Sequence, residues 1–275
     1  MPGPPLSVLI PALQEAGRLP LLLADLAAAP SLVREVVVVD GGSRDRSRDL
    51  ARLVGARVLV AGPGRGRQLC VGAECCSGPW LLVLHADARL RPGWAEAVQR
   101  ALAAGARDQR RQLWCFPLRV VADLQEQSPS GPVFRCLGAL VGLRSRFWRR
   151  PYGDQGLLLP MALYRAVGGF QPLPLMEDLD LVQRLARQQR PRLLPPLLLV
   201  DGRRWLGLGL WRTAWINAGL RRAWHRGVPA AVLARYYRAP WAFRRRTRRR
   251  NAAGWAPAPN PDCGRTPPRR DRRTG

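Results

Sequence analysis

The sequence predicts an α/β protein with a mostly parallel, Rossmann-like sheet flanked by helices. Short apolar runs alternate with segments whose leucines recur at helical spacing, which is the βαβ pattern. The apolar runs end abruptly at turn residues and show no polar alternation, as is typical of strands buried on both faces. With 275 residues, 47% of them hydrophobic, the chain is long enough for one domain of about 230 residues and a tail.

The first half of the chain carries the clearest alternation. The run from Glu35 to Val39 is rich in β-branched residues and predicts a strand, with Asp40 at its carboxyl end. The expected elements of this half are a strand at 6–10 stopped by Pro11, a helix at 18–28, a strand at 35–39, a helix capped by Ser43 or Asp45 and ending at Val54, and a strand at 57–60.

The stretch from Trp80 to Pro92 contains the first candidate ligand-binding residues. Its apolar run ends at Leu84 and is followed by His85-Ala86-Asp87, so an imidazole and a carboxylate stand at a strand's carboxyl end. Ligands of open α/β sheets bind in the crevice outside those ends. An Asp that only caps a strand-to-helix turn explains these residues equally well when they are taken alone.

A glycine-rich basic loop, residues 61–67 (AGPGRGR), precedes that stretch. It matches neither the P-loop nor the dinucleotide fingerprint, which follows the first strand. Gly64 and Gly66 would let backbone amides approach a phosphate, with Arg65 and Arg67 adding charge. A solvated loop is the alternative, and a short helix is expected at 68–76.

The second half continues the alternation less regularly. The residues expected to matter there are the three carboxylates of Glu177-Asp178-Leu179-Asp180, which open an amphipathic helix and also suit its macrodipole. The other expected elements are a helix at 92–103, a strand at 113–118, a helix at 133–147, a strand at 157–159 and a helix at 161–167 closed by Gly168-Gly169.

The net charge and the cysteines limit which classes of protein this chain can belong to. The net charge is +26, but every basic side chain apart from two histidines is Arg, so compositional drift accounts for much of it and the charge says little about partners. The six cysteines contain no C-x-x-C pair, which argues against a zinc site, and the adjacent Cys75 and Cys76 argue against a disulfide framework. We expect free thiols in a cytoplasmic protein with no secretory signal.

Five stretches, taken together and in order, resemble the family 2 glycosyltransferases, the inverting nucleotide-sugar enzymes of the GT-A fold. Each is weak alone, and the ordered set spans residues 6 to about 190. They are residues 8–15 (VLIPALQE), 38–45 (VVDGGSRD), 84–87 (LHAD), 167–170 (VGGF) and 177–181 (EDLDL). The His-Ala-Asp form, residues 152–156 (YGDQG) and the C-terminal motifs at 211–213 and 235–237 extend the resemblance to a bacterial-type branch labelled as associated with arsenosugar biosynthesis.

The resemblance implies a role for each matching residue. Asp40 would accept a hydrogen bond from the nucleobase, and Pro11, Ala12 and Glu15 would line the nucleotide pocket. Asp87 matches the carboxylate that binds a divalent cation, Mn²⁺ or Mg²⁺, which neutralises charge on the leaving nucleoside diphosphate. Asp178 matches the base that takes the proton of the acceptor hydroxyl, with Glu177 beside it. Donor-site candidates are Pro11, Ala12, Glu15, Asp40, Arg67, His85 and Asp87.

Three departures from the family pattern leave questions open. Gln14 stands where the family usually has Asn, and Gly41 where it often has a second Asp. His85 replaces the first Asp of Asp-x-Asp, so it is a metal ligand, a ribose contact or a packing residue. Asp154 and Gln155 are candidates for contact with the acceptor, with a turn-stabilising role as the alternative.

The C-terminal part changes character twice. Residues 201–243 are expected to form a helical extension of a catalytic domain that covers residues 1–200. Its tryptophans and arginines suit a membrane interface, but packing of the Trp211 and Trp215 stripe against the catalytic domain is slightly favoured, and peripheral membrane contact is a hypothesis. Residues 244–275, rich in Arg and Pro, are expected to be a disordered tail.

We therefore expect a glycosyltransferase that uses a nucleotide-sugar donor, UDP-linked by resemblance, and an unidentified acceptor, either a small molecule or lipid-linked. One alternative is a degenerate GT-A protein that docks to membrane or nucleic acid through its Arg-rich C-terminus. Another is a nucleotidyltransferase, but residues 11–15 (PALQE) lack the glycine-rich phosphate loop which that class places after the first strand. No sequence-specific nucleic-acid binding is expected.

Overall fold

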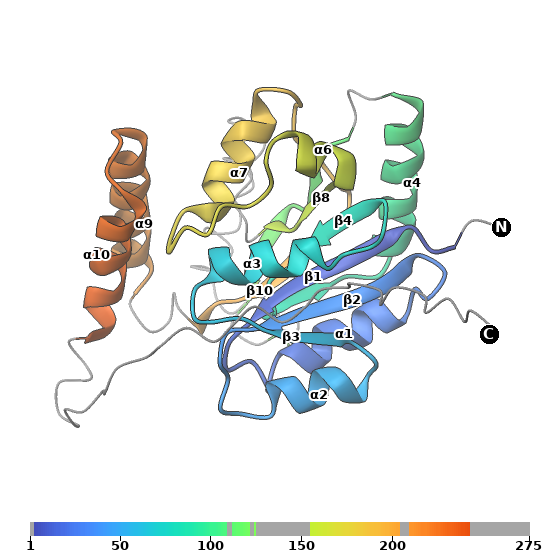
Figure 1. The fold of residues 1–275 in the computed structure, drawn as a ribbon, viewed down its shortest axis with the longest axis horizontal. Helices are drawn as coiled ribbons and strands as arrows, with labels where there is room; N and C mark the ends of the chain where they lie inside the picture. Colours follow the sequence, from blue (N-terminus) through green and yellow to red (C-terminus); the bar gives the residue numbers. More distant parts are fainter. Residues whose placement is uncertain (1–2, 109–111, 122–123, 125–154, 204–208, 243–275) are drawn as a thin grey trace, which may run out of the picture.

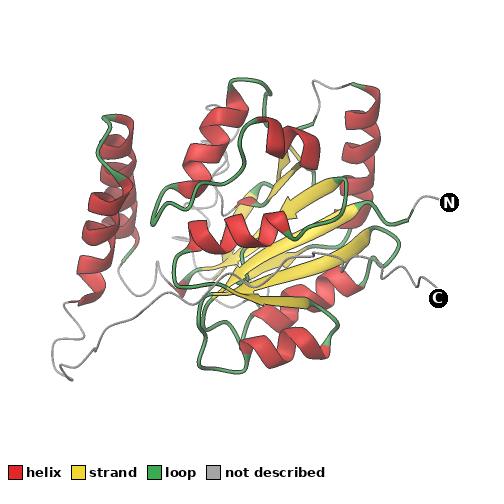
Figure 2. Cartoon of the chain, in the orientation of Figure 1, coloured by secondary structure: helices red, strands yellow, loops and turns green. Residues whose placement is uncertain are grey.

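The computed structural model describes residues 3–108, 112–121, 124, 155–203 and 209–242 (Figure 1). The predicted helix at 133–147, the segment Tyr152-Gly153-Asp154 and the tail at 244–275 lie outside the described residues. Within the described part, the protein is an α/β structure whose central sheet has helices on both faces, as predicted (Figure 2).

The amino-terminal half follows the predicted alternation closely. A helix follows each of β1, β2 and β3 and packs back onto the sheet, which is why these strands and β4 run parallel, whereas β4 leads directly to β5. The elements are β1 (Leu6–Ala12), α1 (Leu19–Ala27), β2 (Val33–Asp40), α2 (Ser47–Leu53), β3 (Arg57–Val60), α3 (Arg65–Glu74), β4 (Trp80–Val83), β5 (Ala88–Leu90) and α4 (Trp94–Arg107).

The carboxyl-terminal half differs from prediction. The expected strand at 113–118 is two short strands, because Phe116 and Pro117 form no strand pairing, and β9 and β10 were not expected. The elements are β6 (Trp114–Cys115), β7 (Leu118–Val121), β8 (Leu157–Pro160), α6 (Met161–Ala166), α7 (Glu177–Ala186), β9 (Arg192–Leu193), β10 (Leu198–Asp201), α9 (Leu210–His225) and α10 (Ala230–Ala242).

The main sheet has the strand order β3-β2-β1-β4-β8-β6-β9. Strands β3, β2, β1 and β4 are parallel to one another, whereas β8 is antiparallel to both β4 and β6. A second sheet pairs β5 with β10 and β10 with β7. The mostly parallel half thus presents the carboxyl ends of β1, β2 and β4 at one edge, and polar loops follow each of them.

Two clusters of buried hydrophobic side chains pack against the two faces of this sheet. Alternate residues of β1 enter different clusters: Val8 and Ile10 pack with the leucines of α1 and with α4, whereas Leu9 packs with α3 and α7. The tight approach of α3 to the sheet requires Gly72, since a Cβ there would lie 2.2 Å from a methyl of Leu9. Both faces of β1 are therefore fixed by packing, and so is the direction of the loop that follows it.

The cysteines differ from expectation at one position. Cys70, Cys76 and Cys115 are free thiols, and burial raises the pKa of the Cys76 thiol to about 12. Cys75 is disulfide-bonded. The expectation that every cysteine is a free thiol is therefore wrong at Cys75.

Candidate functional site

The predicted donor-site residues meet at the carboxyl edge of the parallel strands. Asp40 is the last residue of β2 and pairs in register with Ala12, the last residue of β1. β4 lies on the other side of β1, and His85 and Asp87 follow its end. Strand topology alone therefore gathers residues from three separate sequence motifs at one edge.

Asp40 is held in one orientation with one oxygen left over. Its Oδ2 accepts hydrogen bonds from the backbone N–H groups of Gly42 and Ser43, both at 2.9 Å, and the guanidinium of Arg48 lies 3.8 Å away. The residue is fully buried, and its Oδ1 has no hydrogen-bond partner among the described residues. Because an unpaired buried acceptor costs free energy, this oxygen is a candidate for a bond from a ligand.

The loop after β1 is fixed by side chains of the loop after β2. The backbone N–H of Gln14 donates to Ser43 Oγ, and that of Glu15 to Ser47 Oγ, at 2.9 and 2.8 Å. Gln14 has a positive φ of 60°, a conformation that Asn adopts more readily than Gln. The departure from the family's Asn therefore falls at a position where the backbone itself favours Asn.

Gln68 joins the ends of the first two strands, a role that no feature of the sequence had indicated. Its side chain is buried, and its amide donates to the carbonyl oxygens of Ala12 and Val39, at 2.9 and 2.7 Å. A Cβ at position 41 would lie 3.0 Å from the same amide, so the glycine after Asp40 makes room for Gln68. Gly41 thus replaces the family's second Asp at a point with little space for a side chain.

Asp87 and Glu15 are brought together by Arg203, which follows β10. The guanidinium of Arg203 donates to both carboxylate oxygens of Glu15 and lies 3.4 Å from Asp87 Oδ2. Burial raises the pKa of the Asp87 carboxyl, and Glu15 adds to the rise, while His85 and Arg203 oppose it. From the sequence, Arg203 belongs with the other C-terminal arginines, and nothing local to it marks this contact.

His85 is a neutral imidazole in this arrangement. Burial, followed by the charge of Arg65, lowers the pKa of His85 to about 4. Arg65 Nη1 lies 2.9 Å from His85 Nε2, and because a guanidinium only donates, Nε2 is the accepting nitrogen and Nδ1 carries the hydrogen. Nδ1 lies 4.0 Å from Asp87 Oδ1, so the ring joins Arg65 on one side to Asp87 on the other.

Arg65 also reaches the two acidic residues that open α7. Its Nε pairs with Glu177, which is 1% exposed, and its Nη2 lies 2.9 Å from Asp178 Oδ2. Asp178 is partly exposed, and its Oδ1 accepts the N–H of Leu179 at 2.8 Å. Adjacent residues at a helix start point in different directions, so Glu177 faces inward and Asp178 faces the pocket.

The residue before these carboxylates has an unusual backbone. Met176 has a positive φ of 68°, and its carbonyl accepts the first bond of α7 from Asp180 at 2.9 Å. A left-handed conformation at a residue other than Gly or Asn costs free energy and occurs where the surrounding structure enforces it. The entry of the chain into α7, and hence the direction of Asp178, is therefore set by its surroundings.

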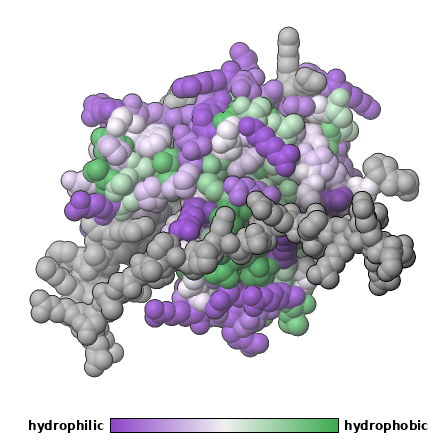
Figure 3. Space-filling view, viewed as in Figure 1, coloured by the Kyte–Doolittle hydropathy of each residue, from purple (hydrophilic) through white to green (hydrophobic). Residues whose placement is uncertain are grey.

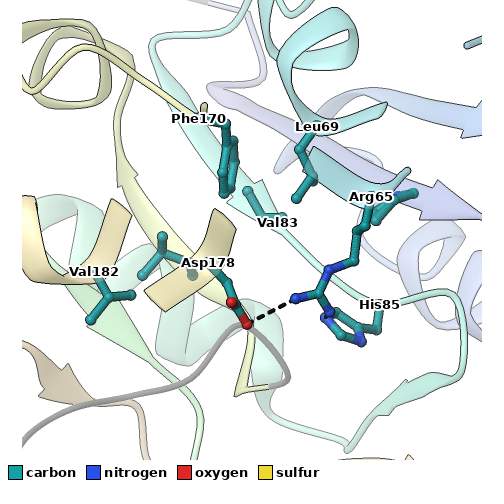
Figure 4. Close-up of a pocket in the computed structure, with 9 residues that line it drawn as sticks. Arg65, Leu69, Val83, His85, Phe170, Asp178 and Val182 are labelled. Atoms are coloured by element: carbon teal, nitrogen blue, oxygen red, sulfur yellow. Dashed lines mark hydrogen bonds and ion pairs between the residues drawn. The ribbon is translucent and has the colours of Figure 1, made fainter. Parts of the chain in front are cut away.

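These side chains close one side of a small pocket (Figure 4). Arg65, His85 and Asp178 form its polar side, and Figure 4 shows the guanidinium between the imidazole and the carboxylate. The remaining lining is apolar: Pro11, Leu69, Val83, Leu157, Phe170 and Val182. The pocket thus sets a basic and an acidic group against an apolar wall at the strand ends.

The glycine-rich loop differs from expectation. Helix α3 begins at Arg65, inside this loop, and Arg67 is exposed on the outer side of the helix with no described contact to the other candidate residues. Gly66 packs against the chain near Leu173, where a Cβ would lie 2.3 Å from the carbonyl oxygen. Gly66 thus serves close backbone packing, and Arg65 is the arginine of this loop that faces the candidate site.

The third carboxylate of α7, Asp180, and the acceptor-side candidate Gln155 have local partners. Asp180 is paired with Arg184 at 2.6 Å, and Arg184 also binds the carbonyl of Gly169, so this pair ties α7 to the turn after α6. Gln155 is fully buried, and its amide donates to the carbonyl of Phe116 at 3.1 Å. Gln155 therefore stabilises the neighbouring strand connection, and Asp154 lies outside the described residues.

Metal-binding capacity rests on Asp87. Among the described residues, no three His, Cys, Asp or Glu side chains come together as a metal-binding group. His85 Nδ1 carries the ring hydrogen while Arg65 donates to Nε2. The imidazole therefore has no free lone pair for a cation bound at Asp87 in this arrangement. A single carboxylate fits a cation whose remaining ligands are phosphate oxygens and water, as is usual for Mg²⁺ at nucleotide sites.

Known proteins resemble this chain both in sequence and in fold. Residues 7–109 match the family model described as glycosyl transferase family 2. A PGL/p-HBAD biosynthesis glycosyltransferase of Mycobacterium tuberculosis is 34% identical over 94 residues, which are 32% of this chain and 37% of that protein. The chain thus spans little more than a third of the length of the curated relatives it matches.

Solved structures with the same fold cover more of the chain. A mannosyltransferase from Pyrobaculum calidifontis, solved with GDP-Man and Mn²⁺, is 16% identical with a TM-score of 0.53, over 81% of this chain and 62% of that one. A glucosyl-3-phosphoglycerate synthase from Mycobacterium tuberculosis, solved with Mn²⁺, UDP-Glc and phosphoglyceric acid, is 22% identical with a TM-score of 0.50, over 70% of each chain. At these identities the likeness shows the fold, which is the predicted GT-A type.

Proposed function

We propose that the chain is a family 2 glycosyltransferase, which transfers a sugar from a nucleotide-sugar donor to an acceptor hydroxyl with inversion; the match of residues 7–109 to the family model supports this proposal. The observation that carries the proposal is the meeting of Asp40, Asp87 and Asp178 around one strand edge, with Arg65 joining His85 to Asp178. The predicted arsenosugar label of the branch remains a prediction.

The donor half of the site recognises a nucleoside diphosphate in this proposal. Asp40 Oδ1, a buried acceptor without a partner among the described residues, takes the imide N–H of the base. Pro11, Ala12 and Glu15 form the adjoining wall. A UDP-sugar is the expected donor, but guanine also presents an N–H to a carboxylate, and solved structures of this fold hold UDP-Glc and GDP-Man.

A divalent cation held by Asp87 and the diphosphate would neutralise the charge of the leaving group. Arg203 keeps Asp87 and Glu15 side by side, so that the metal-binding carboxylate has a fixed orientation. The protein supplies the remaining orientation through its own hydrogen bonds, chiefly those of Gln68 to the ends of β1 and β2.

The acceptor half is built around Asp178. As general base, Asp178 takes the proton of the acceptor hydroxyl, whose oxygen attacks the anomeric carbon while the diphosphate leaves from the opposite side. Glu177 is buried against Arg65 and so positions that guanidinium, and Arg65 in turn orients Asp178. The apolar wall of the pocket, with Phe170 and Val182, excludes water from the attacking position.

Calorimetric titration tests the donor half. UDP and GDP are titrated into the full chain with and without Mn²⁺, beside Asp87→Ala and a matched control, Asp49→Ala, whose carboxylate is 71% exposed on α2. We expect metal-dependent binding of one nucleotide that Asp87→Ala abolishes and Asp49→Ala retains. Binding of neither nucleotide under any condition would favour the degenerate GT-A alternative.

A second measurement tests the acceptor half. Asp178→Asn should retain nucleotide binding but lose turnover of the donor by on the order of 10²-fold or more, because the general base is removed and the shape is kept. Equal turnover by Asp178→Asn and the wild-type protein would exclude Asp178 as the base.

A further inference from the structure

Helices α9 and α10 form a pair beside α7. The ionised side chains of this pair are all positively charged. Residues 210–242 contain six arginines and no Asp or Glu. Figure 1 shows the two helices side by side at one end of the molecule, and Gln183 of α7 lies 3.3 Å from His225 of α9. Because the pair itself contains no acidic side chain to balance its arginines, its surface is strongly electropositive.

The side of α9 that packs inward carries uncharged side chains. Thr213 and Leu220, seven residues apart and hence on one face, are 1% and 8% exposed. On α10 the buried residues include Leu233 and Ala234. The helix pair thus has a packed face, and its larger side chains point elsewhere.

The opposite side of α9 combines a large aromatic residue with arginines. Trp215 is 77% exposed, contrary to the expectation that it packs against the catalytic domain. Arg222 and Arg226, seven and eleven residues further along, are exposed and point within about 20° of the direction of Trp215 on a regular helix. The indole and the two guanidinium groups therefore lie along one stripe.

Helix α10 adds residues of the same kinds. Tyr236 is 69% exposed and Val232 is 38% exposed, with the exposed Arg235 between them in sequence. In Figure 3 hydrophobic and hydrophilic side chains lie next to one another over this end of the molecule. We call the exposed side of α9 the basic aromatic surface; its residues are Arg212, Trp215, Arg222 and Arg226.

We propose that the basic aromatic surface docks onto lipid bilayers that contain anionic lipids. An indole gains free energy at headgroup depth, where its ring meets the acyl boundary, and guanidinium groups beside it pair with lipid phosphates. The exposed indole of Trp215 gives this surface an apolar group that a bilayer buries. The absence of Asp and Glu from both helices removes the repulsion that an anionic surface would otherwise meet.

Vesicle co-sedimentation with the full chain tests the proposal. We expect binding to phosphatidylcholine vesicles that contain about one third phosphatidylglycerol, and weak binding to phosphatidylcholine alone. Trp215→Ala should lower the partition coefficient roughly tenfold. Arg222→Glu with Arg226→Glu should lower it by about 25-fold or more, since each basic residue near an anionic surface contributes about fivefold.

Two controls separate this surface from general charge and hydrophobicity. Arg100→Glu with Arg107→Glu makes the same change in net charge on the exposed side of α4, and Leu53→Ala removes a leucine that is 82% exposed on α2. Neither should change binding more than about twofold, because they lie on other elements. Circular dichroism and UDP titration of each variant report whether the fold and the donor site are intact.

Several results would overturn the proposal. Equal losses from the α4 and α9 charge reversals would mean that only net charge matters. The proposal also fails if the protein binds an oligonucleotide but no vesicles. It fails as well if sedimentation velocity shows a dimer that Trp215→Ala dissociates, because Trp215 would then lie between two copies of the chain. Failure of nucleotide binding would bear on the proposed transferase function alone, since vesicle binding is measured without donor or acceptor.

Discussion

The guanidinium of Arg65 lies 2.9 Å from the carboxylate of Asp178, and it joins the first turn of α3 to the first turn of α7. The same guanidinium pairs with Glu177 and contacts His85, so one side chain links the loop after β4 to the proposed base. Its three nitrogens meet three groups from two different segments of the chain. The orientation of Asp178 therefore depends on Arg65, which lies outside the motifs at 84–87 and 177–181.

Replacing Arg65 should destabilise the protein through Glu177. With Arg65→Ala the buried carboxylate of Glu177 loses its cation, and we expect a loss of about 3 kcal/mol in the free energy of unfolding. In a Glu177→Gln background the same replacement should cost about 1.5 kcal/mol less, because no buried charge is left unpaired. Urea unfolding of the four proteins measures this difference.

The control for that cycle is an exposed pair on α2. Arg52 lies 3.7 Å from Asp49, and both side chains are more than half exposed, so Arg52→Ala should cost less than about 0.5 kcal/mol. Additive effects of Arg65→Ala and Glu177→Gln would contradict a direct dependence of Glu177 on Arg65.

The low pKa of His85, about 4, makes stability dependent on pH in a definite direction. The folded protein binds the proton only below this pKa, whereas the unfolded chain binds it below about 6.5. Stability from His85 is therefore complete above pH 6.5 and is lost as the pH falls towards 4, by roughly 2 to 3 kcal/mol. The raised pKa of Asp87 acts in the opposite direction at acid pH, so the observed loss should be smaller.

Thermal unfolding between pH 7 and 4, compared with His85→Asn, measures this contribution. The variant should lose stability less steeply over that range, because Asn does not titrate. An NMR titration, with the two histidines assigned through His225→Gln, gives the His85 pKa directly. A His85 ring that becomes charged near pH 6.5 would refute the lowered pKa of this residue.

Gly66 should tolerate no side chain. A Cβ there would lie 2.3 Å from the carbonyl oxygen of Leu173, and the clash is with backbone, which cannot rotate away. Gly66→Ala should therefore reduce the free energy of unfolding by about 2 to 3 kcal/mol. Gly17→Ala is the matched control, since no atom lies within 4 Å of its Cβ, and it should be neutral or slightly stabilising. Equal unfolding midpoints for the two variants would contradict the close packing of α3.

Much of the fold follows from local patterns. The β-branched run of β2 and the apolar run of β4 are explained by burial on both faces, and their carboxyl ends lead to Asp40 and Asp87. These features depend on residues close in sequence, which is why sequence alone predicts them.

The contacts between distant loops could not be predicted. Arg65 and Arg67 are two positions apart and point in different directions once α3 begins, but the starting residue of the helix depends on the packing of Gly66 against Leu173. The sequence therefore favoured Arg67 as the donor-site arginine, whereas Arg65 faces the site. Arg203 is similar: its contact with Glu15 spans most of the chain, and no local pattern distinguishes it from the arginines around it.

The backbone of Gln14 offers a way to raise stability without touching a ligand group. Gln14 is exposed and has a φ of 60°, which costs an L-residue more than glycine. Gln14→Gly should raise the free energy of unfolding by about 0.5 to 1 kcal/mol, because the relief of strain exceeds the added entropy of the unfolded chain. Gln14→Val, which is β-branched, should lower stability under the same conditions, and the reverse order in urea unfolding would contradict the left-handed conformation.

Arg203 should tune the ionisation of Asp87 and through it the binding of donor. The positive charge of Arg203 opposes the burial that raises the pKa of Asp87, so removing this charge in Arg203→Met raises that pKa further. Because Asp87 must be ionised to hold the cation in this proposal, the pH midpoint of Mn²⁺-dependent UDP binding should move upwards in the variant, and affinity below that midpoint should fall.

The control for Arg203→Met is Arg187→Met, which removes an exposed arginine just after α7. It makes the same change in net charge and should leave both the midpoint and the affinity within about twofold of the wild-type values, because an exposed charge at a distance is screened by salt. Isothermal titration across pH 5 to 8 gives both quantities for the three proteins. A fall in affinity with an unchanged midpoint would mean that Arg203 contacts the nucleotide itself and does not act through Asp87.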